Sequence, residues 1–306
     1  MKIVVLGAGG MLGHMVLDVL AREKDLQAVA TARAEAGAAK AAYPEVSWRA
    51  LDAEAATDGE LAAVLRGAGY AVNCIGLIKQ RMDETKAADV ERAIRVNALF
   101  PQRLGRAAAD AGVRVLQIAT DCVYSGARGS YRESDPHDAL DVYGKTKSLG
   151  ECRASSMSHL RSSIVGPELG EGPSLLSWFL SRPRGESLKG FVDHRWNGVT
   201  TLHFARLCAG VVRAGLKPGA LRHVVPADAV TKHELLDLFA RAYGRGDLSI
   251  AASRSGAAVD RTLATDDSRA NAELWKAAGY DAPPTISRMV EELAQYKTLV
   301  AKAVNA

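Results

Sequence analysis

Cysteine is scarce in this sequence, and the few cysteines show no spacing typical of a metal site. The 306-residue chain has four, none in a Cys-x-x-Cys pair and none grouped with the seven histidines as metal ligands are. The sequence therefore predicts neither a bound metal nor a disulfide framework. We expect a reduced protein of the cytoplasm.

Long hydrophobic runs and blocks of like charge are also missing. The apolar run at residues 3–6 is too short for a signal peptide, and no segment approaches the length of a membrane span. The net charge is only +4, and the basic residues are spread along the chain, so there is no nucleic-acid footprint. We expect neither a membrane nor a nucleic acid as partner, whereas a small basic excess suits an anionic substrate.

What the sequence does have is a glycine-rich loop directly after its first apolar run. Residues 3–6 predict a buried strand, and residues 14–20 have the apolar spacing of a helix. The glycines between them fit Gly-x-x-Gly-x-x-Gly, although the commoner Gly-x-Gly-x-x-Gly spacing fails. Strand, loop and helix together indicate a dinucleotide site with phosphates at the helix N-terminus. The loop residues expected to contact the dinucleotide are Gly7, Gly10, Met11, Leu12 and Gly13.

The next predicted strand, residues 27–31, ends without an acidic residue. An acid at this place bonds the ribose 2′-hydroxyl in NAD-preferring sites. Arg33 stands there instead, and its guanidinium can hold a 2′-phosphate in a bidentate manner. The sequence therefore favours NADP(H) over NAD(H); the alternative is an exposed loop arginine that binds no ligand.

Two further predicted strands, residues 46–51 and 70–76, end in residues suited to the same ligand. Asp52 can accept a hydrogen bond from the adenine amine. Lys79 lies in the following loop, at the sheet edge where ligands collect, and is either a substrate contact or a solvated side chain. Cofactor contacts are also expected from Cys74, Ile75 and Gly76.

Three polar residues farther along the chain carry the candidate chemistry. A strand over residues 113–119 ends at Thr120, whose hydroxyl can bond a substrate carbonyl oxygen. Tyr143 and Lys147 stand four residues apart, the spacing that places two side chains on one helix face. Tyrosine titrates near ~10, and a neighbouring ammonium would lower the pKa of Tyr143 toward neutral pH. Such a tyrosine can give or take the proton when a carbonyl becomes an alcohol. Alone, the pair also fits a solvated helix face.

In combination, the glycine loop, Thr120 and the Tyr-x-x-x-Lys pair resemble the extended, nucleotide-sugar-modifying branch of the short-chain dehydrogenase/reductase superfamily. Residues 118–126 and 143–151 look most like those of the dTDP-4-dehydrorhamnose reductase family. The resemblance is good through residue 166 and thin afterwards. It implies an NAD(P)-dependent oxidoreductase acting on a CH–OH group, with a nucleotide-diphosphate sugar as substrate.

The resemblance also implies roles for individual residues. Tyr143 would be the general acid for ketone reduction, Lys147 would bond the nicotinamide ribose, and Thr120 would orient the carbonyl. Asn97, expected to be partly buried in a helix over residues 87–111, matches an asparagine that supports a proton-relay water in many relatives. The cofactor carries the hydride chemistry, and the protein supplies position and electrostatics.

The residues after Thr120 depart from the patterns of two relatives. Dehydratases of this branch carry an acidic pair there, whereas this chain has Asp121 and Cys122, which argues against elimination of water. The reductases usually have an aromatic residue where Cys122 stands. We therefore expect Asp121 and Cys122 to contact the substrate in a pocket that differs from theirs.

The second half of the chain offers weaker signals. Residues 160–166 predict a sixth strand that places Ile164 near the nicotinamide. Trp178 and Trp196 either stack on the substrate or belong to the core. Arg261 either binds the nucleotide diphosphate or forms a surface ion pair.

Strands alternating with helices predict an α/β fold, a Rossmann-type doubly wound parallel sheet with helices on both faces. Residues 1–166, with 191–221 returning to them, are expected to form the NAD(P)-binding domain. Residues 167–190 and 222–306 are expected to form a smaller α/β substrate-binding domain, with the active site in the cleft between the two. A homodimer is expected by analogy alone.

The leading hypothesis is NADPH-dependent reduction of the 4-keto group of a nucleotide-linked 4-keto-6-deoxyhexose, in deoxysugar and cell-surface polysaccharide biosynthesis. One alternative is an epimerase of the same superfamily, which would show no net cofactor consumption. Another is a non-catalytic dinucleotide-binding sensor. The intact set of Thr120, Tyr143 and Lys147 argues against a sensor, which needs no proton donor.

Overall fold

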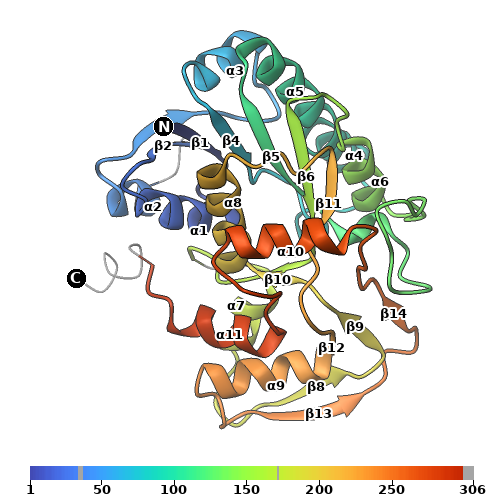
Figure 1. Ribbon diagram of the computed structural model, residues 1–306. Helices are drawn as coiled ribbons and strands as arrows, with labels where there is room; N and C mark the ends of the chain where they lie inside the picture. Colours follow the sequence, from blue (N-terminus) through green and yellow to red (C-terminus); the bar gives the residue numbers. More distant parts are fainter. Residues whose placement is uncertain (34–36, 171, 299–306) are drawn as a thin grey trace.

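The structure is a computed structural model that describes residues 1–33, 37–170 and 172–298. Its largest element is a seven-stranded sheet in which all neighbouring strands are parallel (Figure 1). With β1 between β2 and β4, the strand order is that of a doubly wound Rossmann-type sheet, which confirms the expected fold class. From one edge to the other, the strands are β3 (Ser47–Ala50), β2 (Gln27–Ala32), β1 (Lys2–Leu6), β4 (Tyr70–Asn73), β5 (Arg114–Ala119), β6 (Met157–Arg161) and β11 (Leu221–His223).

Both faces of this sheet are covered by helices, and the side chains of β1 show why. Successive side chains of a strand point to opposite faces. Ile3 and Val5 belong to one hydrophobic cluster, and Val4 and Leu6 belong to another; all four are fully buried. The first cluster includes residues of α1 (Met11–Ala21) and α8 (Thr201–Ala214), and the second includes residues of α3 (Asp58–Leu65) and α5 (Phe100–Ala111).

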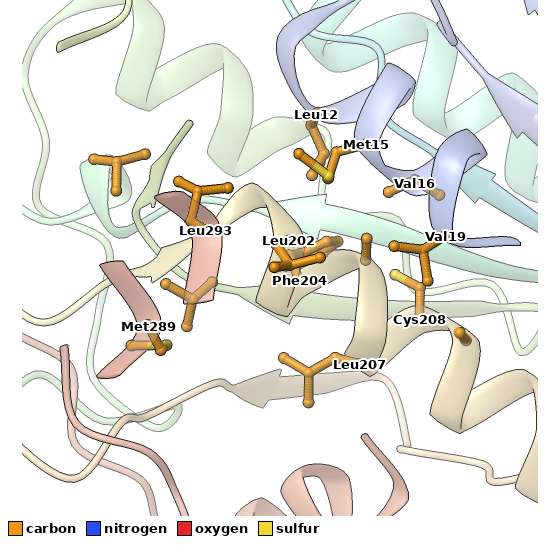
Figure 2. Packing of buried hydrophobic residues seen from close by; sticks show 14 of the residues in the cluster. Leu12, Met15, Val16, Val19, Leu202, Phe204, Leu207, Cys208, Met289 and Leu293 are labelled. Atoms are coloured by element: carbon orange, nitrogen blue, oxygen red, sulfur yellow. The ribbon is translucent and has the colours of Figure 1, made fainter. Parts of the chain in front are cut away.

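Helix α8 links the sheet to the C-terminal part of the chain. It packs along α1, and its apolar side chains, among them Leu207 and Cys208, are fully buried (Figure 2). Met289 and Leu293 of α11 (Ile286–Gln295) join the same cluster. Burying such a side chain contributes roughly 1.5–3 kcal/mol to the free energy of unfolding. Packing in this cluster therefore holds α11, the last helix of the described chain, and α1, the first, in one hydrophobic core.

Three small sheets lie outside the main one, toward the lower half of Figure 1. They are β7 (Ile164–Val165) with β10 (Val199–Thr200), β8 (Ser187–Phe191) with β13 (Ser249–Ser253), and β12 (Val230–Thr231), β9 (His194–Trp196) and β14 (Val259–Asp260). The remaining helices are α2 (Gly37–Ala42), α4 (Ala87–Ala93), α6 (Val142–Leu149), α7 (Leu175–Leu180), α9 (Lys232–Ala242) and α10 (Ser268–Ala277).

Two expected elements are divided in the structure. The helix predicted over residues 87–111 is α4, a π-helical segment, Ile94–Leu99, and α5 in succession. The strand predicted over residues 160–166 was wrong as a single strand, because β6 ends at Arg161 and Ile164 begins β7 in another sheet. The break lets β6 pair with β5 and lets β7 pair with β10.

The predicted division into two domains remains a prediction. The boundary at residue 222 falls inside β11, which pairs with β6 in the main sheet. Residues 171 and 299–306 of the second predicted domain lie outside the described part of the chain. None of the helices described is long and apolar enough to cross a membrane.

Candidate active site

The glycine loop joins β1 to α1 in a form that suits a dinucleotide. Gly7 has a φ of +76°, which favours glycine, and its amide donates to the Thr31 hydroxyl at 3.2 Å. A Cβ on Gly13 would lie 2.0 Å from the carbonyl oxygen of Gly7, so only glycine permits this approach of helix to loop. Helix α1 begins at Met11 after Gly10, which leaves its first amides directed at the loop. The glycine loop therefore has a shape that fits phosphate groups.

The loop residues expected to contact the dinucleotide differ in exposure. Met11 is half-buried, whereas the side chain of Leu12 lies in the core with only 6% exposed. The backbone of Leu12 is thus the part available to a ligand.

Arg33 directly follows β2 and is exposed, with no hydrogen bond or ion pair to another described residue. Asp52 follows the neighbouring β3 and is also exposed, and one of its oxygens accepts from the Glu54 amide at 3.0 Å. Ala32 and Ala50 are register partners in the two strands. Arg33 and Asp52 therefore lie at the same carboxyl edge of the sheet, where a ligand can reach both.

The loop after β4 meets the glycine loop at the point where the strand order reverses. The Cys74 amide donates to the carbonyl oxygen of Leu6 at 3.0 Å. A Cβ built on Gly7 would lie 2.7 Å from Cγ1 of Ile75, so the two loops are in contact. Gly76 follows and is exposed. Open α/β sheets bind their ligands at this kind of crossover.

Asn97 lies in the π-helical segment and is 1% exposed. Its carboxamide accepts from the Leu77 amide at 2.8 Å and donates to the Leu77 carbonyl oxygen at 2.9 Å. It also donates to the Thr146 hydroxyl of α6 at 3.3 Å. The structure thus gives Asn97 a positioning role between the loop after β4 and α6, and its role toward a cofactor or water remains a prediction.

Thr120 and Tyr143 are brought together as expected. The Thr120 hydroxyl accepts from the Cys122 amide at 3.1 Å and donates to a carboxylate oxygen of Asp121 at 3.2 Å, and it lies close enough to the Tyr143 hydroxyl to influence its pKa. Burial raises the pKa of Tyr143, the nearby Cys122 raises it further, and the Thr120 hydrogen bond only partly opposes this. The expected lowering of the Tyr143 pKa was therefore wrong, because the largest effect on it is desolvation of the phenolate by burial.

Lys147 lies one helical turn after Tyr143 on α6, and its side chain is buried. Its ammonium donates to the carbonyl oxygen of Ile118, on β5, at 3.2 Å. Burial lowers the pKa of Lys147 to about 8, against the opposing attraction of Glu151. The side chain is therefore charged at neutral pH and fixed against the end of β5.

Lys79 forms an ion pair in the structure, and its contact with a substrate remains a prediction. Its ammonium lies 2.6 Å from a carboxylate oxygen of Asp141, whose other oxygen accepts from the Gly144 amide at 2.7 Å. Asp141 is the N-cap of α6, so Lys79 holds the start of the helix that carries Tyr143.

Asp121 and Cys122 directly follow Thr120, and electrostatic interactions with both affect the pKa of Tyr143 and the pKa of Lys232. Asp121 is buried, and burial raises its pKa although Arg261 and Lys232 act in the opposite direction. Burial, followed by the charge of Asp121, raises the pKa of Cys122 to about 12. The thiol therefore stays neutral and offers no nucleophile at working pH.

The expected residues from the second half occupy different surroundings. Trp178 is half-buried and packs against the core of the first cluster. Trp196 is 4% exposed, and its indole nitrogen has no hydrogen-bond partner among the described residues. Arg261 donates to the carbonyl oxygen of Tyr124 at 2.8 Å and faces Asp121. Ile164 lies half-buried on β7.

Two features were missed from the sequence. Lys232, at the start of α9, places a cation close to Asp121 and Cys122. Arg161, at the end of β6, is fully buried with its guanidinium bound by both oxygens of Glu151 at 2.6 Å. Neither residue belongs to a recognisable spacing, because their partners come from distant segments. A lysine at the first helical position and an arginine ending an apolar strand were the only signals.

The comparisons with known proteins agree with this geometry. A family model described as the RmlD substrate binding domain matches residues 1–297. A dTDP-4-dehydrorhamnose reductase of Mycobacterium tuberculosis is 29% identical over 156 residues, which cover 49% of this chain and 44% of that protein. The chain thus spans less than half the length of that relative. A dTDP-4-dehydrorhamnose reductase of Streptomyces griseus is 25% identical over 276 residues, 78% of this chain and 90% of that one.

Solved structures share the fold at low identity. The dTDP-4-dehydrorhamnose reductase from Bacillus anthracis, in complex with NADP, superimposes with a TM-score of 0.70 at 16% identity, covering 95% of this chain and 98% of that one. Complexes with NAD also occur among the structures of this fold. The resemblance drawn from the motifs is confirmed by the match over residues 1–297. The chain belongs to the RmlD substrate binding domain family.

Proposed function

We propose that the protein is an NAD(P)-dependent oxidoreductase that reduces the 4-keto group of a nucleotide-linked 4-keto-6-deoxyhexose, in the formation of deoxysugars for cell-surface polysaccharides. The observation that carries the proposal is the proximity of the Thr120 and Tyr143 hydroxyls, with the buried side chain of Lys147 one helical turn after Tyr143 on α6. These groups lie where β5 and α6 meet, at the carboxyl edge of a sheet whose glycine loop fits a dinucleotide. The names of the relatives support the same reaction.

Each of these side chains has a distinct task in the proposed reaction. Because burial raises its pKa, Tyr143 keeps its proton at neutral pH and can donate it to the alkoxide that forms from the ketone. Thr120 orients the carbonyl oxygen toward Tyr143, and Lys147 holds the ribose of the cofactor. The cofactor, when bound, supplies the hydride. The protein therefore contributes position, a proton and a water-poor setting.

The proposal is tested by following NADPH absorbance with the purified chain and a panel of dTDP-, GDP- and UDP-linked 4-keto-6-deoxyhexoses. Oxidation of NADPH with one member of the panel is the expected result, and it identifies the nucleotide and the sugar together. Tight cofactor binding without oxidation would overturn the reductase. Isomerised sugar in the same tubes would then replace it with an epimerase.

The preference for NADPH over NADH rests on Arg33. Replacing Arg33 with alanine is expected to weaken NADPH binding roughly 10- to 100-fold, because charge-assisted hydrogen bonds to the 2′-phosphate are lost. NADH carries no such group, so its affinity should stay unchanged. Titration calorimetry with both cofactors measures the difference, and Arg254→Ala, an exposed arginine after β13, is the matched control. Equal losses for both cofactors would refute the role of Arg33.

The lowered pKa of Lys147 predicts how cofactor affinity depends on pH. The ammonium is charged below about 8 and neutral above it, and only the charged form is a full hydrogen-bond donor to the ribose. Affinity for NADH, which lacks the titrating 2′-phosphate, should therefore be constant from pH 6 to 7 and fall above pH 8 toward the affinity of a variant without the charge. Lys147→Met should bind weakly at every pH, whereas Lys145→Met, at an exposed position of α6, should keep the wild-type profile. A flat wild-type profile would contradict this role.

A further inference from the structure

A cation outside the recognised motifs faces the proposed site. Lys232 is the first residue of α9, and a capping box between Thr231 and Glu234 fixes this end of the helix. Its ammonium lies 5.5 Å from the ring centroid of Trp196. It has no hydrogen bond or ion pair with another residue in the described ranges, although the side chain is half-buried. A partly desolvated ammonium that has a ring contact but no hydrogen bond or ion pair is costly, which points to a missing anion.

The charges around Lys232 have an excess of positive sign. Burial lowers its pKa, and the nearby Asp121 and Cys122 only partly oppose this. Arg261 faces the same Asp121 from the segment after β14. Arg261 also lies near Asp141, which is paired with Lys79. Three cations, Lys79, Lys232 and Arg261, thus face two carboxylates, Asp121 and Asp141. This part of the site therefore carries an excess of positive charge among the described residues.

We propose that Lys232 is a substrate-contacting residue whose ammonium binds the diphosphate of the nucleotide sugar. The assignment rests on the proposed function, because the diphosphate is the anionic group of a nucleotide-linked neutral deoxyhexose. Trp196, whose ring faces the ammonium at 5.5 Å, positions this side chain, and Arg261 supplies the second cation. The glycine loop after β1 is assigned to the diphosphate of the cofactor, so the proposal gives the two diphosphates different residues.

Calorimetry with UDP and with dTDP, on the full chain saturated with NADPH, tests the assignment. Lys232→Met keeps an unbranched side chain of similar length and removes the charge, so we expect nucleoside diphosphates to bind roughly 10- to 100-fold more weakly. Lys232→Arg should retain most of the affinity, since it keeps the charge. Lys189→Met, at an exposed position of β8, is the matched control and should bind as the wild type does. Uridine and thymidine, which lack phosphate, should bind the wild type and Lys232→Met equally.

The outcomes separate this assignment from the function on which it rests. Unchanged diphosphate affinity in Lys232→Met, with normal binding by the wild type, overturns the role of Lys232 and leaves the reductase standing. An equal loss for nucleosides and nucleoside diphosphates also overturns it, since that would show a structural effect on the pocket. Failure of the wild type to bind any nucleoside diphosphate overturns both the assignment and the nucleotide-sugar substrate. A loss confined to diphosphates, restored by arginine, supports it.

Discussion

Replacing Tyr143 with phenylalanine is expected to lower kcat roughly 10²- to 10⁴-fold, the usual contribution of a positioned general acid. The substitution removes the hydroxyl that Thr120 contacts and leaves the ring in its half-buried place on α6. Cofactor affinity should not change, because the proposed anchors for the cofactor are the glycine loop and Lys147. Single-turnover oxidation of NADPH, combined with a cofactor titration, measures the two effects separately.

A second tyrosine serves as the control that distinguishes loss of the proton donor from a general effect of the Tyr-to-Phe change on the protein. Tyr243 follows α9, is half-buried, and has no hydrogen bond from its hydroxyl to the rest of the described chain. Tyr243→Phe should therefore turn over at the wild-type rate. If Tyr143→Phe also kept its turnover, Tyr143 would not be the proton donor and the assignment of the site would fail.

Replacing Glu151 with glutamine is expected to lower the free energy of unfolding by roughly 3–5 kcal/mol, the cost of removing one partner from a buried ion pair. The guanidinium of Arg161 is fully buried, and both oxygens of Glu151 bind it. Its other nitrogen donates to the Tyr124 hydroxyl at 2.7 Å and lies 2.8 Å from His223. Neither the Tyr124 hydroxyl nor the neutral His223 ring can replace the negative charge that Glu151→Gln removes. Urea denaturation followed by circular dichroism measures the change.

The control for Glu151→Gln is the same substitution in an exposed pair. Glu273 lies 3.2 Å from Arg269 on α10, and both side chains are more than half exposed. Exposed pairs contribute roughly 0–1 kcal/mol, so Glu273→Gln should unfold almost as the wild type does. Equal stability of the two variants would show that Glu151 does not neutralise Arg161 in the folded protein.

The main sheet could be predicted from the sequence because its signals are local. A short apolar run such as residues 3–6 predicts a buried strand. Gly7 and Gly13 predict positions where a side chain would prevent the close approach of two backbone segments. Thr120 and Tyr143 could be paired because a strand end and a helix face are both defined by nearby residues. The resemblance to a known family then predicted that the glycine loop, Thr120 and the Tyr-x-x-x-Lys pair belong to one site, because they occur in the same order there.

The remaining features depend on contacts between distant segments. The pKa of Tyr143 rises because of burial by its surroundings, which the Tyr-x-x-x-Lys spacing does not reveal. Lys79 was expected to be a substrate candidate, yet its partner Asp141 lies 62 residues away. The break after Arg161 follows from the pairing of Ile164 with Val199, again a long-range choice. Residues with such partners show no periodic pattern in the sequence.

The carboxamide of Asn97 has a consequence for the motions of the site. It binds the backbone amide and carbonyl groups of Leu77 and the hydroxyl of Thr146. A Cβ on Gly150 would lie 1.9 Å from the backbone carbonyl oxygen of Asn97. The loop after β4 and the helix that carries the proton donor are therefore clamped by one residue. Local unfolding of either segment must release the other, so the two form one cooperative unit. The relative placement of the loop after β4 and of Tyr143 should accordingly be kept or lost together.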